Sequence, residues 1–155
     1  MTPIVILLLG MKINRTLEAK KTSLSKDKEW LTKWAERFYS AAIDFNDAVE
    51  ECIHELYWIS YYSSKKVPEW ECQLKEKNKY IFSIIEKASR SNSNLQTAAE
   101  FAPKHKDDVL KCANQAFNLL SALLQIKQGN IDEIRLRLFA FNKVAMAAHR
   151  EILGE

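Results

Sequence analysis

The feature that most constrains the fold of this 155-residue chain is a stripe of apolar residues with helical spacing. Its members lie three or four positions apart, and no glycine or proline interrupts them. They are Leu31, Trp34, Phe38, Ala41, Phe45, Val49, Cys52, Leu56 and Ile59. This spacing places them on one face of an α-helix, which is then buried against other elements. The stripe predicts a helix over residues 26–63, with Ser25 as its N-cap.

A second long helix is predicted after Pro68, because the missing N–H of proline costs nothing at the first helical position. Its apolar periodicity continues to about residue 102. The Ser- and Asn-rich stretch 89–94 is the weakest part, because these side chains compete for backbone hydrogen bonds. Pro103 ends or kinks this helix.

Two shorter helices are predicted in the last third of the chain. The third helix begins near residues 104–107, and its apolar residues cover two neighbouring faces, so we expect burial on two sides. Gly129 suits the position after a helix, and Asn130 suits the N-cap of the fourth helix. Short loops make successive helices turn back on one another. The expected fold is all-α, an up-down-up-down antiparallel four-helix bundle with two long N-terminal helices.

The chain length predicts one domain. We assign residues 25–155 to a single helical-bundle domain and residues 1–24 to a segment that is first apolar and then basic. The apolar part, MTPIVILLLGM, is shorter than the ~20 residues of a membrane-spanning helix and lacks the positive start of a signal peptide. Three roles remain open for it: docking on the bundle or on a second copy, peripheral anchoring, or an extension ahead of a start at Met11.

One stretch of the first helix carries two incomplete metal-binding motifs. Glu51-x-x-His54 is half of a di-iron signature, but neither of the other two histidines has a glutamate three residues before it. His54-Glu55-x-x-Trp58 has tryptophan, which is not a metal ligand, where a zinc-protease motif has its second histidine. Helical geometry also turns Glu51 and His54 away from the predicted core. We therefore predict no metal, no cofactor and no catalytic residue.

Other enzyme classes also lack their sequence signals. The carboxylates that could hold Mg²⁺ lie mainly on the first helix, with no matching set on a facing helix. Three glycines are too few for a phosphate-binding loop, and no nucleophile motif is present. Binding is therefore favoured over catalysis, with a metal-dependent hydrolase or oxidase in an all-α bundle as the alternative.

The main functional hypothesis concerns an acidic-aromatic face on the first helix. Six residues fall within an arc of about 60° on the helical wheel. They are Asp44, Asp47, Glu51, Glu55, Trp58 and Tyr62. Such a strip suits a protein partner with a basic surface, with the aromatic side chains as anchors. The simpler interpretation is a solvated acidic face, with Trp58 packed on the second helix or on another subunit.

Basic residues gather at one pole of the predicted bundle. Residues 12–28 contain six lysines and arginines and two acidic residues. In an antiparallel bundle Lys104, Lys106 and Lys111 reach the same end. This basic pole makes a nucleic-acid-binding accessory protein a further alternative, through contacts with phosphates.

The expected function is non-enzymatic: macromolecular binding by a helical bundle that associates with itself as a homo-oligomer. A projecting apolar stripe on a long helix favours a dimer. Cys52, Cys72 and Cys112 are odd in number and widely spaced, which indicates free thiols in a reducing compartment. We therefore expect a cytoplasmic location.

Overall fold

The computed structural model describes the backbone of residues 3–65, 71–126 and 129–155, and the side chains of residues 14–64, 72–73, 75–125 and 129–155. Every element in these ranges is helical, which confirms the all-α class. The elements are α1 (Pro3–Lys65), α2 (Glu71–Ala98), a short 3-10 helix η2 (Ala99–Phe101), α3 (Lys106–Ile126) and α4 (Ile131–Leu153).

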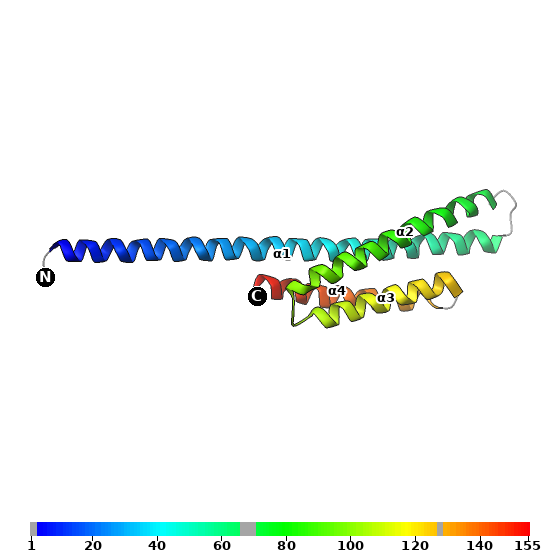
Figure 1. Cartoon of the computed structure of the whole chain (residues 1–155). Coiled ribbons are helices and arrows are strands. Elements are labelled where there is room, and N and C mark those ends of the chain that lie inside the picture. Colours follow the sequence, from blue (N-terminus) through cyan, green and yellow to red (C-terminus); the bar gives the residue numbers. More distant parts are fainter. Residues whose placement is uncertain (1–2, 66–70, 127–128) are drawn as a thin grey trace.

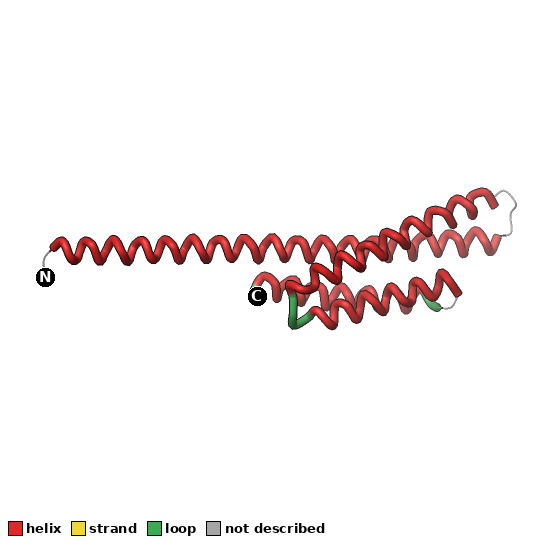
Figure 2. Tube along the Cα trace, viewed as in Figure 1, coloured by secondary structure: helices red, strands yellow, loops and turns green. Residues whose placement is uncertain are grey.

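The helices are packed around the C-terminal half of α1. Figure 1 shows α2 turning back alongside α1, while α3 and α4 form a helical hairpin beside this pair. α1 packs mainly on α2 and α4, and α3 packs mainly on α4. Figure 2 follows the same path and shows the loop between η2 and α3 at the end of the packed region from which α1 projects. α1 is thus the element that links α2 to the α3–α4 hairpin.

The core forms where the apolar stripes of the four helices meet. Phe45 of α1 meets Phe141 of α4 edge-on, with ring centroids 5.1 Å apart. Both rings are completely buried, and full burial of such a side chain stabilises the fold by about 1.5–3 kcal/mol. Other fully or almost fully buried apolar residues are Phe38, Val49, Ile84, Leu95, Val109, Leu120, Ile134 and Leu138. Buried apolar residues of all four helices therefore form one core.

The first helix is longer than the sequence predicted. α1 begins at Pro3 and is 63 residues long, which corresponds to about 95 Å. The prediction that it starts near residue 26 is wrong, because Ser25 lies inside the helix. No glycine or proline occurs from residue 11 to residue 65, and many of the residues before Ser25 are good helix formers. A potential N-cap marks a helix start only where the chain upstream cannot continue the helix.

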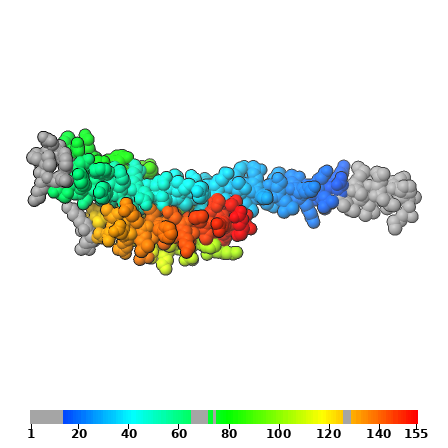
Figure 3. Space-filling view, turned by 180° about the vertical axis from the view of Figure 1, so that it is seen from behind, coloured from blue at the N-terminus to red at the C-terminus, as the bar shows by residue number. Residues whose placement is uncertain are grey.

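The N-terminal part of α1 projects from the bundle, as Figures 1 and 3 show. Every side chain from Asn14 to Lys33 is exposed, and Trp34 is the first that is partly covered. Trp34 stacks on Phe101 of η2 with ring centroids 4.5 Å apart, so this contact marks the end of the bundle. We call residues 14–33 the arm.

The second helix is continuous through its weakest stretch. Residues 89–94 are α-helical, and α2 continues to Ala98 before η2 ends it just ahead of Pro103. Pro103 therefore ends the helix without kinking its interior, in agreement with one of the two predicted effects. The predicted start at Pro68 lies outside the described residues.

The last helix has both of its ends fixed by local hydrogen bonds. The Asn130 side chain accepts a hydrogen bond from the Asp132 N–H at 2.9 Å, which confirms Asn130 as the N-cap. At the other end Gly154 takes a left-handed conformation with φ +77°. Its N–H donates to the Glu151 carbonyl at 3.0 Å, which satisfies an orphan carbonyl of the last turn.

A core substitution should show that the meeting of α1 and α4 stabilises the fold. We expect Phe45→Ala to lower the free energy of unfolding by about 3–5 kcal/mol, because it leaves a cavity beside Phe141. Phe82→Ala is the control, since Phe82 is 72% exposed, and should change stability by less than about 0.5 kcal/mol. Urea unfolding followed by circular dichroism measures both. Equal effects of the two substitutions would contradict this description of the core.

Candidate functional site

The acidic-aromatic face lies along the edge of α1 that borders α2. Asp44 and Asp47 are exposed, Glu51 is half-buried, and Glu55 is buried with only 7% of its surface exposed. Exposure thus falls toward the C-terminal half of the face, where α2 covers α1. The six predicted residues share one edge of the helix, but they do not form one uniformly exposed strip.

Glu51 is held by two side chains of α2. The Tyr80 hydroxyl donates to Glu51 Oε1 at 2.7 Å, and Lys87 Nζ donates to Oε2 at 3.1 Å. The hydrogen bond from Tyr80, followed by that from Lys87, keeps the pKa of Glu51 below its ordinary value. The same contacts with the Glu51 carboxylate raise the pKa of Tyr80 and of Lys87. The ionised carboxylate therefore links α1 to α2.

Glu55 makes a second link between the same two helices. Lys77 Nζ donates to Glu55 Oε2 at 2.6 Å. The Glu55 side chain is far less exposed than that of Lys77, 10% against 30%. A carboxylate with so little solvent exposure needs its lysine partner, because an unpaired buried charge is strongly destabilising. Glu55 thus holds the two helices together and offers little surface to another molecule.

The aromatic end of the face belongs to a larger cluster. The ring of Trp58 stacks on Tyr62 with centroids 5.7 Å apart, and it meets Tyr57 and Tyr61 edge-on. Trp58 Nε1–H donates to His54 Nε2 at 3.2 Å. Trp58 and Tyr62 are half-buried, whereas Tyr57 and Tyr61 are exposed. The cluster places four aromatic rings on the last turns of α1, of which the sequence hypothesis included two.

The residues of the two incomplete metal motifs are engaged by other side chains. His54 is exposed and bonded to Trp58, while the Glu51 carboxylate is occupied by Tyr80 and Lys87. Within the part of the chain that the structure describes, no three His, Cys, Asp or Glu side chains lie close enough together to hold a metal ion. The arrangement suits hydrogen bonding between helices more than metal binding.

The three cysteines differ in their surroundings. Cys52 is completely buried in the core, and this burial raises the pKa of its thiol to about 12. Cys72 is exposed, and Cys112 is half-buried. A thiol with so high a pKa is a poor nucleophile, so Cys52 acts as a small core residue.

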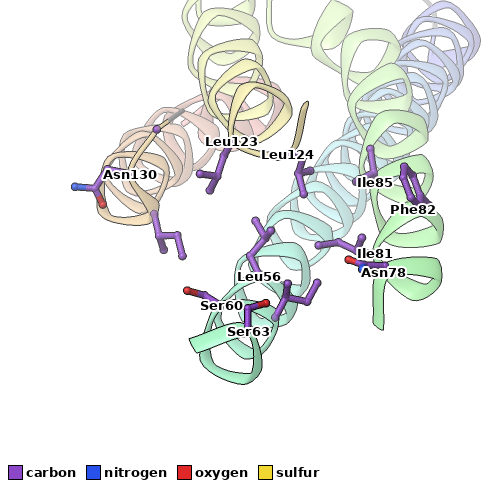
Figure 4. Close-up of a pocket in the computed structure, with 13 residues that line it drawn as sticks. Leu56, Ser60, Ser63, Asn78, Ile81, Phe82, Ile85, Leu123, Leu124 and Asn130 are labelled. Atoms are coloured by element: carbon purple, nitrogen blue, oxygen red, sulfur yellow. The ribbon is translucent and has the colours of Figure 1, made fainter. Parts of the chain in front are cut away.

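A pocket that the sequence did not predict lies between the last turns of α1, the first half of α2 and the α3–α4 connection. Its volume is about 750 Å³. Figure 4 shows Leu56, Ile81 and Leu124 pointing into the space between the helices. Its lining residues are Leu56, Ile59, Ser60, Ser63, Asn78, Ile81, Phe82, Ile85, Leu123, Leu124, Gly129, Asn130 and Ile131. None of these described residues titrates in the physiological range, so the pocket supplies no acid or base.

The pocket arises because α2 diverges from α3 toward this end of the bundle (Figure 1). Leu56 belongs to the predicted stripe of the first helix. Leu123 and Leu124 lie on the third helix, for which burial on two sides is predicted, yet all three are only half-buried. Apolar periodicity predicts which face of a helix is covered, but it carries no signal for how far two neighbouring helices splay apart.

Comparisons with protein-family models, with curated proteins and with solved structures found no match. Across the described ranges, no helix is both long and apolar enough to cross a membrane. The function is therefore inferred from the geometry of the chain itself.

The Glu51 contacts give stability a defined pH dependence. Because the folded-state pKa of Glu51 is lowered, its contribution is fully present above its ordinary pKa of 4.5 and is lost as the pH falls through the lower value. We expect wild type to exceed Glu51→Gln in free energy of unfolding at pH 7, and this excess should shrink below about pH 4.5.

Urea unfolding at several pH values measures this excess. Glu50→Gln, at an exposed carboxyl on the same helix, is the control and should stay close to wild type throughout. A Glu51→Gln difference that does not change between pH 7 and pH 3 would contradict the proposed linkage.

Proposed function

We propose that this chain is a non-enzymatic protein that binds other macromolecules and associates with itself. In this proposal an up-down-up-down antiparallel four-helix bundle is the base from which α1 extends. The observation that carries the proposal is the exposure of every side chain in the arm. A single helix in water is marginally stable, and most helical stability in proteins comes from packing. A projecting helix therefore supports a binding role.

The acidic-aromatic face is the proposed site for a protein partner with a basic surface. Asp44 and Asp47 are free to contact a partner, because both are exposed. Glu51 and Glu55 are each paired with a lysine of α2, so they add little net negative charge to the face. Trp58 and Tyr62 supply aromatic surface at the other end of the face, where the neighbouring tyrosines are exposed. Complementary charge of this kind speeds association and selects partners.

The surroundings of the titratable groups support binding over catalysis. The apolar pocket has no titratable residue among its described lining residues, and Glu51 and Glu55 are each paired with a lysine of α2. A metal-dependent hydrolase or oxidase remains the alternative from a different class. Elemental analysis of natively purified protein tests it, because that alternative requires about one metal ion or more per chain.

The arm also favours a second candidate, binding to nucleic acid. Its basic residues are Arg15, Lys20, Lys21, Lys26, Lys28 and Lys33, against three acidic residues. The Trp34–Phe101 contact brings the α2–α3 connection to the base of the arm, although Lys106 of the predicted basic pole is paired with Glu100. Binding through phosphates should weaken steeply as salt is raised, and no binding to duplex or single-stranded DNA or RNA at low salt would rule it out.

Charge reversal at the exposed end of the face tests the partner proposal. We expect Asp44→Lys/Asp47→Lys to reduce capture of basic proteins from the native host at least about tenfold, because it replaces attraction by repulsion. Glu76→Lys/Glu86→Lys on α2 changes the net charge equally and should capture as wild type does. All four residues are exposed. The contacts that the changes remove, from Asn46 to Asp47 and from Arg90 to Glu86, lie at the surface, so folding should change little.

Quantitative mass spectrometry of the retained proteins gives the readout. Glu51 and Glu55 are left unchanged, because their reversal would break contacts within the fold and mimic a loss of binding. Retention of the same basic proteins by wild type and both variants would exclude Asp44 and Asp47 from the site.

A further inference from the structure

The pocket between the last turns of α1, the first half of α2 and the α3–α4 connection exposes side chains that face the core. Leu56 of α1, Ile85 of α2 and Leu124 of α3 pack against buried core residues, yet all three are only half-buried. Nearer the middle of the bundle, α1 and α3 bury Phe45 and Leu120 completely. Figure 4 shows Leu56 and Leu124 turned toward the same hollow. The core is therefore open to this pocket.

The hollow has the size and the composition of a site for a small molecule. Its volume is about 750 Å³. Such sites usually measure roughly 300–1,000 Å³ and are mainly apolar, with a few polar groups that orient the ligand. Eight of the thirteen described lining residues are aliphatic or aromatic, so the pocket is apolar enough to hold an apolar ligand. Water that fills such a hollow is released when the ligand enters, and this release favours binding.

The pocket is apolar at one end and polar at the other. Along α1 its lining residues run from Leu56, nearer the middle of the bundle, to Ser63, which lies about 10 Å farther out. Along α2, which runs back beside α1, Asn78 lies at this outer end and Ile85 lies toward the middle of the bundle. A ligand with one apolar end and one polar end therefore has a defined direction in the pocket.

The polar groups at the outer end are neutral. None of the described lining residues is charged. Within the described ranges, the side chains of Ser63 and Asn78 have no hydrogen-bond partner in the chain. A charged ligand would leave its ion unpaired among aliphatic side chains, which is strongly unfavourable. A hydroxyl or carbonyl group, by contrast, can form a hydrogen bond with a serine or an asparagine side chain.

We propose that this pocket binds a neutral small molecule made of an aliphatic chain with one hydroxyl or carbonyl group at its end. The chain lies between Leu56, Ile85 and Leu124, and the polar group lies between Ser63 and Asn78 at the outer end. This role goes beyond macromolecular binding, since the described lining residues belong neither to the acidic-aromatic face nor to the arm.

Isothermal titration calorimetry of the full chain with decanol and with decanoate tests the ligand class. The two probes have the same chain length and differ in the charge of the polar end at neutral pH. We expect decanol to bind with a negative heat-capacity change, which marks the burial of apolar surface. Decanoate should bind at least about tenfold more weakly, because its carboxylate meets no positive charge among the described lining residues. Decanol that does not bind, or decanoate that binds as tightly, would overturn the proposal.

Removal of the two polar groups tests where the hydroxyl of the ligand lies. Ser63→Ala/Asn78→Ala should weaken decanol binding about threefold to tenfold, which corresponds to the loss of one net hydrogen bond. Both residues are exposed, so folding should change little. Ser83→Ala, at an exposed position of α2 outside the pocket, is the control and should bind decanol as wild type does. An unchanged affinity in the double variant would contradict this placement.

Filling the pocket tests where the aliphatic chain lies. Leu124→Trp should weaken decanol binding at least about tenfold, because the indole ring takes up space that the ligand needs. Leu136→Trp on α4, at a residue that is 64% exposed, is the control and should bind as wild type does. Thermal unfolding followed by circular dichroism checks that both variants are folded. A folded Leu124→Trp variant with wild-type affinity for decanol would overturn the proposal.

Sedimentation equilibrium distinguishes a small ligand from a second copy as the occupant. Leu124→Trp should have the same oligomeric state as wild type at every concentration, because the pocket takes no part in self-association. A changed oligomeric state would show that a second copy covers the pocket, and it would overturn the small-molecule site.

Discussion

The burial of one face of α1 is the constraint on which the rest of the structure depends. Phe45 packs edge-on against Phe141, and the stripe around it holds α2 on one side and α4 on the other. The same face continues N-terminal to Trp34, where none of the described helices covers it. The apolar face of α1 therefore holds the bundle together and continues along the arm as an exposed apolar edge. The self-association that we propose would use the exposed continuation of the face that the fold buries.

Contacts with α2 divide the acidic-aromatic face into parts with different roles. Glu51 and Glu55 are satisfied within the chain, by Tyr80 and Lys87 and by Lys77. A carboxylate that already has its hydrogen bonds gains little from a new partner and loses water on binding. The proposed function assigns recognition to the exposed aspartates and the aromatic cluster. The position of α2 thus determines which carboxylates of this face are exposed to a partner and which are hydrogen-bonded within the fold.

Local patterns predicted the helices and the core well, because apolar periodicity and N-cap chemistry act over a few residues. Asn130 caps α4, and Phe38 and Phe45 are buried. The start of α1 was missed, since Ser25 permits a helix start but cannot impose one on a helix-forming sequence. The burial of Glu55 and the splay that opens the pocket depend on where α2 lies. A helical wheel of a single helix contains no such information.

Hydrogen exchange of the full chain as a function of concentration tests most directly whether a second copy covers the arm. We expect peptides from residues 14–33 to become more protected as concentration rises, because pairing stabilises the helix there. Peptides from the buried part of α1 around Phe45 should stay equally protected throughout. Arm amides that exchange at the rate of an unfolded chain at every concentration, or that are fully protected in the monomer, would contradict the account.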